Sequence, residues 1–187
     1  RGLQVYKRPL AAHRLHLRIP AEARAVMGHT RMTTQGSAKK NYNNHPFFGH
    51  VKEESFALAH NGVLWNDLEL RHAKHLPRTK VQTDSYIAVQ LLEQKKSLDF
   101  DSLRYMAEQV EGSFSFTVLD EQSALWIVKG DSPLSIAYFP ERGVYVYAST
   151  VEILNKALTR CGKQLGHRRT VEVEMGDLLK IDRRGHI

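Results

Sequence analysis

The spacing of apolar residues in the middle of the chain predicts helices. Ile87, Ala88, Leu91 and Leu92 are three or four residues apart, which places them on one face of a helix capped by Asp84. The same reading predicts two further helices, over Ser102 to Val110 and over Val151 to Leu158.

Alternation with a period of two predicts strands on either side of these helices. Phe114, Phe116 and Val118 alternate with small polar residues, which is typical of a half-buried strand. Other strands are expected over Leu3 to Lys7, Arg24 to Thr30, Ser55 to Ala59, Ala124 to Lys129, Leu134 to Phe139 and Val144 to Ala148. Short connections indicate that the strands after Gly112 form an antiparallel meander.

Turn residues mark the remaining segments. Residues 32–54 are polar and rich in glycine and asparagine, so a long ordered loop is expected there. Thr170 to Glu174 and Asp177 to Ile181 are expected to form a hairpin around Met175-Gly176. Strands, helices and further strands in this order predict an α+β layered fold.

Length and composition fit one soluble, folded domain. The chain has 187 residues, 42% of them hydrophobic and 25% charged, and no linker divides it, so we expect residues 1–187 to form a single domain. No uncharged run approaches the roughly 20 residues that a membrane helix needs. One cysteine, Cys161, excludes an internal disulfide, and together with the lack of a visible secretory signal it favours the cytoplasm.

The net charge of +7 raises nucleic acid as a partner, and the charge distribution argues against it. Basic residues without acids gather in residues 1–20 and again in residues 155–171. Neither patch has interleaved aromatic residues or zinc-finger spacing, so solvated loops and helix ends explain them better. A nucleic-acid partner would require an affinity that falls steeply with salt.

Histidine pairs do not predict a metal site. His13 with His16, and His72 with His75, lack a third ligand at a diagnostic spacing, so we expect no metal and no cofactor. Cys161 has no predicted base beside it and is expected to be non-catalytic.

Three polar clusters follow or interrupt apolar segments, and they carry the candidate chemistry. They are residues 28–36, 60–62 and 82–84. If the strands over 24–30 and 55–59 are neighbours in one sheet, the polar residues at their ends converge on one site.

The residues in these clusters suit an α-amino acid ligand. The Arg31 guanidinium matches a carboxylate, and the Asp84 carboxylate matches an α-ammonium group. The Asn61 side chain beside the Gly62 N–H provides two donors for a developing oxyanion. Each signal alone also fits a plain structural role: a paired surface arginine, a helix cap, and a turn at residues 60–62.

Taken together, the motifs resemble a known family. GHTRMTTQG at 28–36, NNHPF at 43–47, HNG at 60–62 and TDS at 83–85 occur in the order and spacing of the class II glutamine amidotransferase domain. EGSFSFTVLD at 111–120 agrees with the same family. The resemblance covers nearly the whole chain.

This resemblance implies a fold, an activity and roles for residues. The fold is the four-layer αββα sandwich of the N-terminal nucleophile hydrolases, with two antiparallel sheets. The activity is hydrolysis of the L-glutamine side-chain amide, with ammonia passed to an acceptor domain or protein. Substrate binding is assigned to Arg31, Thr34, Gln35 and Asp84, and the oxyanion hole is assigned to Asn61 and Gly62.

The sequence departs from the family at the nucleophile. The family uses an amino-terminal cysteine, whose thiol attacks the amide and whose own amine acts as base, whereas residue 1 here is arginine. We therefore expect about three dozen further residues, which carry the cysteine and the first strand, to precede this chain. Met32 replaces a frequent aromatic, and Gln35 replaces a histidine found in some relatives.

A non-catalytic member of the family is the alternative hypothesis. Such a domain would keep the sandwich and bind an amino acid or a partner protein as a regulatory module. The alternative predicts no cysteine at the mature terminus. The acceptor of the ammonia and the formation of homo-oligomers are left open by the sequence.

Overall fold

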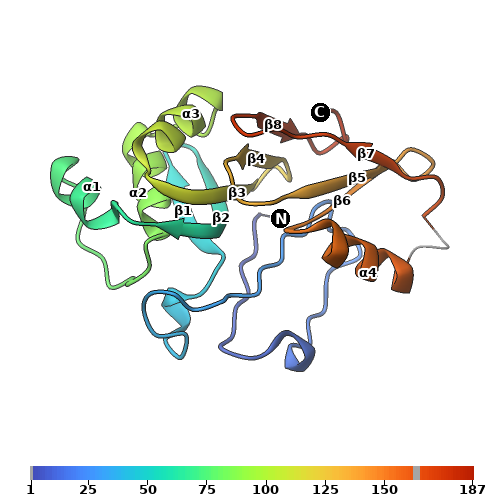
Figure 1. The fold of residues 1–187 in the computed structure, drawn as a ribbon, viewed down its shortest axis with the longest axis horizontal. Coiled ribbons are helices and arrows are strands. Elements are labelled where there is room, and N and C mark those ends of the chain that lie inside the picture. The colour runs from blue at the N-terminus through green and yellow to red at the C-terminus, as the bar shows by residue number, and fades with distance from the viewer. Residues whose placement is uncertain (1, 162–164) are drawn as a thin grey trace.

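The computed structural model describes residues 2–161 and 165–187, in which two antiparallel sheets carry helices on their outer faces (Figure 1). The strands are β1 (Phe47–Val51), β2 (Glu54–Leu64), β3 (Gly112–Asp120), β4 (Leu125–Lys129), β5 (Ser135–Phe139), β6 (Val144–Ala148), β7 (Arg169–Val171) and β8 (Leu178–Ile181). The α-helices are α1 (Asp67–Ala73), α2 (Tyr86–Lys95), α3 (Phe100–Gln109) and α4 (Val151–Cys161), with short 3-10 turns η1 (Ala12–Arg14) and η2 (Asn41–Asn43).

The larger sheet, in the order β1-β2-β3-β4-β8, packs one face against α2 and α3. The strand predicted around Phe116 and Val118 is confirmed as β3, and both residues are fully buried in this core. The strand is not half-buried, because Ser115 and Thr117 on its other face are buried as well. The main core is formed by buried residues of these layers, among them Phe56, Leu58, Ile87, Leu91, Leu103, Met106 and Trp126. The predicted helices over 84–92 and 102–110 are therefore confirmed as α2 and α3.

The smaller sheet, in the order β6-β5-β7, is covered by α4. Ala137, Phe139 and Leu154 form a second, smaller core between β5 and this helix. The inner faces of the two sheets line a shared cavity, which Ala59 and Thr117 enter from one side and Tyr147 from the other. The order of layers is helix, sheet, sheet, helix, so the predicted αββα sandwich is confirmed.

The predicted strands over Leu3 to Lys7 and Arg24 to Thr30 are wrong. Both segments are extended and alternate between exposed and half-buried residues, so the period of two is present. Neither pairs with another strand in the described part of the chain. Because a strand requires a backbone ladder as well as alternation, the pattern alone was insufficient. The proposed convergence of two neighbouring strand ends is wrong for the same reason.

The loop expected over 32–54 is partly structured, and the strand that follows is longer than expected. Residues 32–54 contain η2 and the whole of β1. β2 continues through His60 and Gly62 to Leu64, so the HNG motif lies within a strand rather than after one. Helix α1 follows it and was not predicted.

Asp84 does not cap α2 as predicted. Ser85 occupies the N-cap position, and Asp84 instead accepts a hydrogen bond from the backbone N–H of Leu64 at 2.7 Å. A capping carboxylate does occur on α3, where Asp99 accepts from the N–H of Ser102 at 2.7 Å.

The predicted C-terminal hairpin and the single meander are wrong. β7 pairs with β5 in the smaller sheet, whereas β8 pairs with β4 in the larger one. The chain likewise crosses between sheets after β4, so that β3–β4 and β5–β6 are two separate antiparallel pairs. The turn residues at Met175-Gly176 mark a real turn, but its two arms belong to different layers.

Among the described residues, no helix is long and apolar enough to cross a membrane. The described residues also contain no cluster of histidine, cysteine or acidic side chains suited to hold a metal ion. Two members of the basic patches, Arg1 and Lys163, lie outside the described residues.

Candidate active site

Arg31 lies in an irregular segment between the N-terminal extended region and η2, and its guanidinium is held by oxygen atoms of neutral groups. Nη1 donates to Oδ1 of Asn44 at 3.2 Å, and Nη2 donates to the backbone oxygen of Gln35. Asn44 is buried and also donates from Nδ2 to the backbone oxygen of Ala38 at 2.8 Å. Asn44 therefore closes the loop of residues 31–38 around the guanidinium.

The neighbouring Asn43 connects this loop to the segment before α2. Its Oδ1 accepts from the backbone N–H of Gln82 at 2.9 Å, and its Nδ2 donates to the backbone oxygen of Ser37 at 3.2 Å. Asn43 is fully buried, so these bonds are shielded from competing water. Residues 82–85 are thereby fixed beside the Arg31 loop.

Asp84 is the buried carboxylate of this segment, with 4% of its surface exposed. Besides accepting from the N–H of Leu64, Asp84 has its Oδ1 3.3 Å from Oγ of Ser85. Its negative charge raises the pKa of Arg31, against the larger lowering that burial causes. The two charges are thus within electrostatic reach, yet within residues 2–161 and 165–187 they form no salt bridge with each other.

Three buried or half-buried histidines surround these charges. The rings of His29 and His45 lie 4.2 Å apart, centroid to centroid. His60 Nδ1 lies 2.8 Å from Oγ of Ser85 and Nε2 lies 3.2 Å from the backbone oxygen of Ser113. Since a backbone oxygen only accepts, the neutral ring carries its hydrogen on Nε2 and accepts from Ser85.

Burial keeps the three histidines neutral at pH 7. It lowers the pKa of His29 to about 4, with smaller contributions from His60 and Arg31. Burial also lowers the pKa of His45 well below its usual range and lowers that of His60, where Asp84 opposes the effect. The positive charge of this cluster therefore comes from Arg31 and from Lys7, whose Nζ donates to the backbone oxygen of Asn44 at 2.8 Å.

Asn61 and Gly62 lie side by side on β2. The Asn61 side chain is half-buried and donates from Nδ2 to the backbone oxygen of Pro133 at 3.3 Å. Gly62 has a φ of 140°, and a Cβ atom at this position would lie 2.0 Å from the backbone oxygen of Ser113. A side chain is excluded here, so the close approach of β2 to β3 at this position requires glycine.

A large cavity joins Asn61 to the histidine cluster. It has a volume of about 1490 Å³ and lies between the two sheets, where His29, His60 and Asn61 line its wall. The strand β2 links this wall to the charged pair, because Leu64 binds Asp84 and His60 binds Ser85. The structure thus brings Arg31, Asp84 and Asn61 into one region.

Among the predicted site residues, Thr34 and Gln35 have the fewest side-chain contacts with the rest of the site. Both are exposed in the Arg31 loop. Gln35 contributes its backbone oxygen to the guanidinium, and in the described part of the chain neither side chain forms a hydrogen bond.

The sequence did not indicate the roles of Asn44, Ser85 and His60. Each bonds a candidate site residue or the residue next to one, across a separation in sequence that local patterns do not reveal. What marks these three residues is that they are polar and buried, and burial of a polar side chain is known only from the three-dimensional structure.

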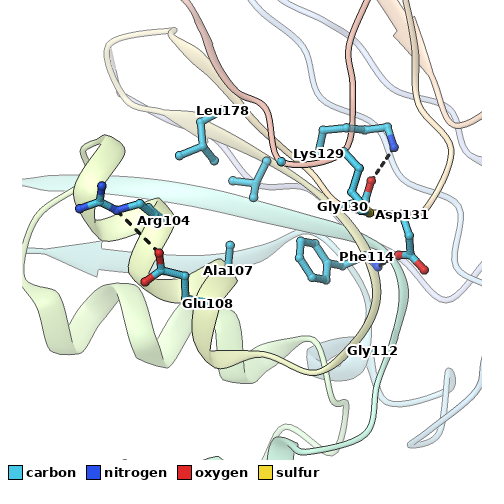
Figure 2. Close-up of a pocket in the computed structure, with 12 residues that line it drawn as sticks. Arg104, Ala107, Glu108, Gly112, Phe114, Lys129, Gly130, Asp131 and Leu178 are labelled. Atoms are coloured by element: carbon cyan, nitrogen blue, oxygen red, sulfur yellow. Dashed lines mark hydrogen bonds and ion pairs between the residues drawn. The ribbon is translucent and has the colours of Figure 1, made fainter.

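A second cavity, of about 580 Å³, lies between α3 and the strands β3, β4 and β8. Figure 2 shows Arg104 and Glu108 on the helix side, with a 3.9 Å ion pair between them, and Phe114 on the sheet side. None of the residues predicted for the site lines this cavity.

Comparison with known proteins places these observations in a family. A sequence model described as glutamine amidotransferase domain matches residues 29–156. The chain is 33% identical over 128 residues to glutamine–fructose-6-phosphate aminotransferase (isomerizing) of Lactococcus lactis, covering 64% of this chain and 20% of that protein. It is 34% identical over 125 residues to the protein of the same name from Streptococcus pneumoniae, covering 62% of the chain and 20% of the relative.

Solved structures agree on the fold. Glutamine phosphoribosylpyrophosphate amidotransferase from B. subtilis, in complex with ADP and GMP, superposes with a TM-score of 0.64 at 24% identity, over 84% of this chain and 32% of that one. The allosteric regulatory enzyme of purine biosynthesis gives a TM-score of 0.61 at 24% identity, over 78% of this chain and 30% of the other. The N-terminal nucleophile hydrolase fold is thereby confirmed. The present chain spans about a fifth of the length of the curated relatives.

Proposed function

Since this chain belongs to the class II glutamine amidotransferase domain family, we propose that it forms the substrate-binding part of an enzyme that hydrolyses the side-chain amide of L-glutamine. The products are glutamate and ammonia, and the ammonia passes to an acceptor domain or protein. We assign the reaction to the cytoplasm.

The observation that carries this proposal is the arrangement of Arg31 and Asp84. A guanidinium and a buried carboxylate lie within electrostatic reach and are not joined by a salt bridge. A zwitterionic α-amino acid presents the complementary pair, with its carboxylate for Arg31 and its ammonium group for Asp84. Thr34 and Gln35, which are exposed in the Arg31 loop, are assigned to contacts with the bound ligand.

Asn61 and Gly62 are assigned to the oxyanion that forms when the amide is attacked. An Asn61 N–H and the backbone N–H of Gly62 are the two donors, and the pairing of β2 with β3, in which Gly62 lies opposite Phe114, fixes the backbone at both residues. Donors fixed in advance stabilise the transition state without reorganising during the reaction.

The nucleophile that the family resemblance implies is an amino-terminal cysteine. Its thiolate attacks the amide carbonyl, ammonia leaves with the proton that the cysteine amine carries, and water hydrolyses the resulting thioester. Cys161 is exposed at the end of α4 and takes no part in this scheme.

Binding of L-glutamine to the chain, measured by isothermal titration calorimetry, tests the head-group assignment. We expect Arg31→Ala and Asp84→Asn to weaken binding by about tenfold or more, because each removes a charged hydrogen bond. Arg104→Ala, which removes an exposed arginine on α3, is the matched control and is expected to bind normally. Unchanged binding by both site variants would contradict the proposal.

Turnover by the full-length protein tests the oxyanion assignment. We expect Asn61→Ala to lower kcat for glutamine hydrolysis by roughly a hundredfold to a thousandfold, with a much smaller change in KM. A large rise in KM at an unchanged kcat would instead place Asn61 in ground-state binding.

A further inference from the structure

The partners of Arg31 differ from those of an ordinary surface arginine. Asn44 and the backbone of Gln35 are both neutral acceptors, whereas Arg104 on α3 bonds to the carboxylates of Asp101 and Glu108. A carboxylate partner would offset the positive charge of Arg31, and a neutral acceptor leaves that charge intact.

The two hydrogen bonds also leave donors available. A guanidinium has five N–H groups in a planar fork, and these bonds occupy one on each terminal nitrogen. Within the described part of the chain, the remaining N–H groups of Arg31 have no acceptor, so they match the two oxygens of an incoming carboxylate.

The orientation of the Asn44 amide is determined by its second partner. The backbone oxygen of Ala38 accepts and does not donate, so the NH₂ group of Asn44 must face it and Oδ1 must face Arg31. With 8% of its surface exposed, Asn44 is shielded from water that would compete for either bond. An aspartate here would bring a negative charge to Arg31 and an oxygen against Ala38.

We propose that Asn44 is a positioning residue that determines specificity for an α-carboxylate, because it fixes the Arg31 guanidinium through an uncharged acceptor and preserves its charge for the ligand. This inference rests on the proposed function and goes beyond it, since it assigns a role to a residue that does not itself contact the substrate. The affinity for the ligand is thus expected to depend on the charge of the side chain at position 44 rather than on its size.

The test compares Asn44→Asp with Asn44→Ala, using two ligands of the chain in calorimetric titrations. The ligands are L-glutamine and 4-aminobutanamide, which is glutamine without its α-carboxylate. Both variants lose the bond to Ala38, and the aspartate variant alone adds a charge beside Arg31. Thermal unfolding of each variant reports the structural damage separately.

We expect Asn44→Asp to weaken L-glutamine binding by about tenfold to a hundredfold, the range of a charged hydrogen bond. Asn44→Ala should weaken it less, although it unfolds at an equal or lower temperature. The affinity for 4-aminobutanamide should change by less than about twofold in Asn44→Asp, because that ligand does not use Arg31.

Each of the following results would overturn the inference. Equal losses for both ligands would show general damage to the loop, and a glutamine affinity that follows unfolding temperature across the variants would show the same. If the unsubstituted chain and Arg31→Ala bind L-glutamine equally, the proposed function fails. If Arg31→Ala loses binding while Asn44→Asp retains it, only the role of Asn44 fails.

Discussion

Burial decides which side chains around Arg31 carry a charge. Burial lowers the pKa values of His29, His45 and His60 and so favours their neutral forms. The guanidinium stays charged because its pKa begins far above neutrality. The cations Arg31 and Lys7, the Asp84 carboxylate and a set of neutral donors remain, and a cation beside a carboxylate is the pattern that an amino acid ligand needs.

His29 makes stability depend on pH. Its pKa is about 4 in the folded protein, against about 6.5 when unfolded, so the unfolded chain binds the extra proton between these values. Stability from this group is therefore present above pH 6.5 and is lost as the pH falls toward 4. The neighbours His60 and Arg31 lower the pKa of His29 in the same direction.

We expect His29→Gln to lose less unfolding free energy than the unsubstituted chain between pH 7 and pH 4.5, by roughly 1 to 2 kcal/mol. Urea unfolding at the two pH values measures the difference, and the carboxylates common to both proteins cancel. The same loss in both proteins would show that His29 is not held neutral by the fold.

Gly62 combines a strained backbone angle with a close contact. Substitution by alanine places Cβ against the backbone oxygen of Ser113, so Gly62→Ala should lower unfolding free energy by about 1 to 3 kcal/mol. Gly176→Ala is the matched control, because its φ of 100° gives similar strain in open space. Urea unfolding compares the two, and an equal loss in both would remove the contact with Ser113 as the cause.

Elements were predicted well where local spacing decides them and poorly where a distant partner decides them. The helix around Leu91 and the alternation around Phe116 follow from spacing within about ten residues. The segment over 24–30 shows the same alternation and forms no ladder, because among the described residues no strand lies beside it. β7 and β8 look like one hairpin, yet each pairs with a strand distant in sequence.

The candidate site residues also differ in whether a local sequence pattern could predict them. Arg31, Asp84 and Asn61 were predicted from polar clusters beside apolar segments and from the motifs that resemble a family, and the predicted role of Asp84 as a helix cap was wrong. The bonds made by Asn44 and by His60 join segments 13 and 25 residues apart, so no local pattern contains them.

Helix α3 is the element on which a carboxylate does act as a cap. The bond from Ser102 N–H to Asp99 lowers the pKa of that carboxyl group, as expected for a donor that favours the charged form. Asp99→Ala should lower unfolding free energy by about 1 kcal/mol. The control is Asp101→Ala, an exposed position on the same helix. Thermal unfolding that ranks the two variants equally would contradict the capping role.

On the scale of the whole molecule, the two layers of helices differ in what they bury. The core between the larger sheet and α2 and α3 is extensive, whereas the core under α4 consists of Ala137, Phe139 and Leu154 with a few half-buried neighbours. The cavity between the sheets further reduces packing across the middle of the sandwich. We therefore expect the smaller layer to be the less stable part of the fold.

Native-state hydrogen exchange should resolve this difference. We expect amides of β5 and β6 to exchange through a partial opening at lower free energy than those of β2 and β3, which should require global unfolding. Leu154→Ala should lower the free energy of opening in the smaller sheet by about 2 to 5 kcal/mol, because Leu154 is 1% exposed. This loss cannot exceed the stability of the smaller sheet itself. Leu103→Ala, in the main core, is the matched control and should reduce protection in β2 and β3. If Leu154→Ala reduces protection equally in both sheets, the sandwich opens as one cooperative unit, and binding at β2 then depends directly on the packing of α4.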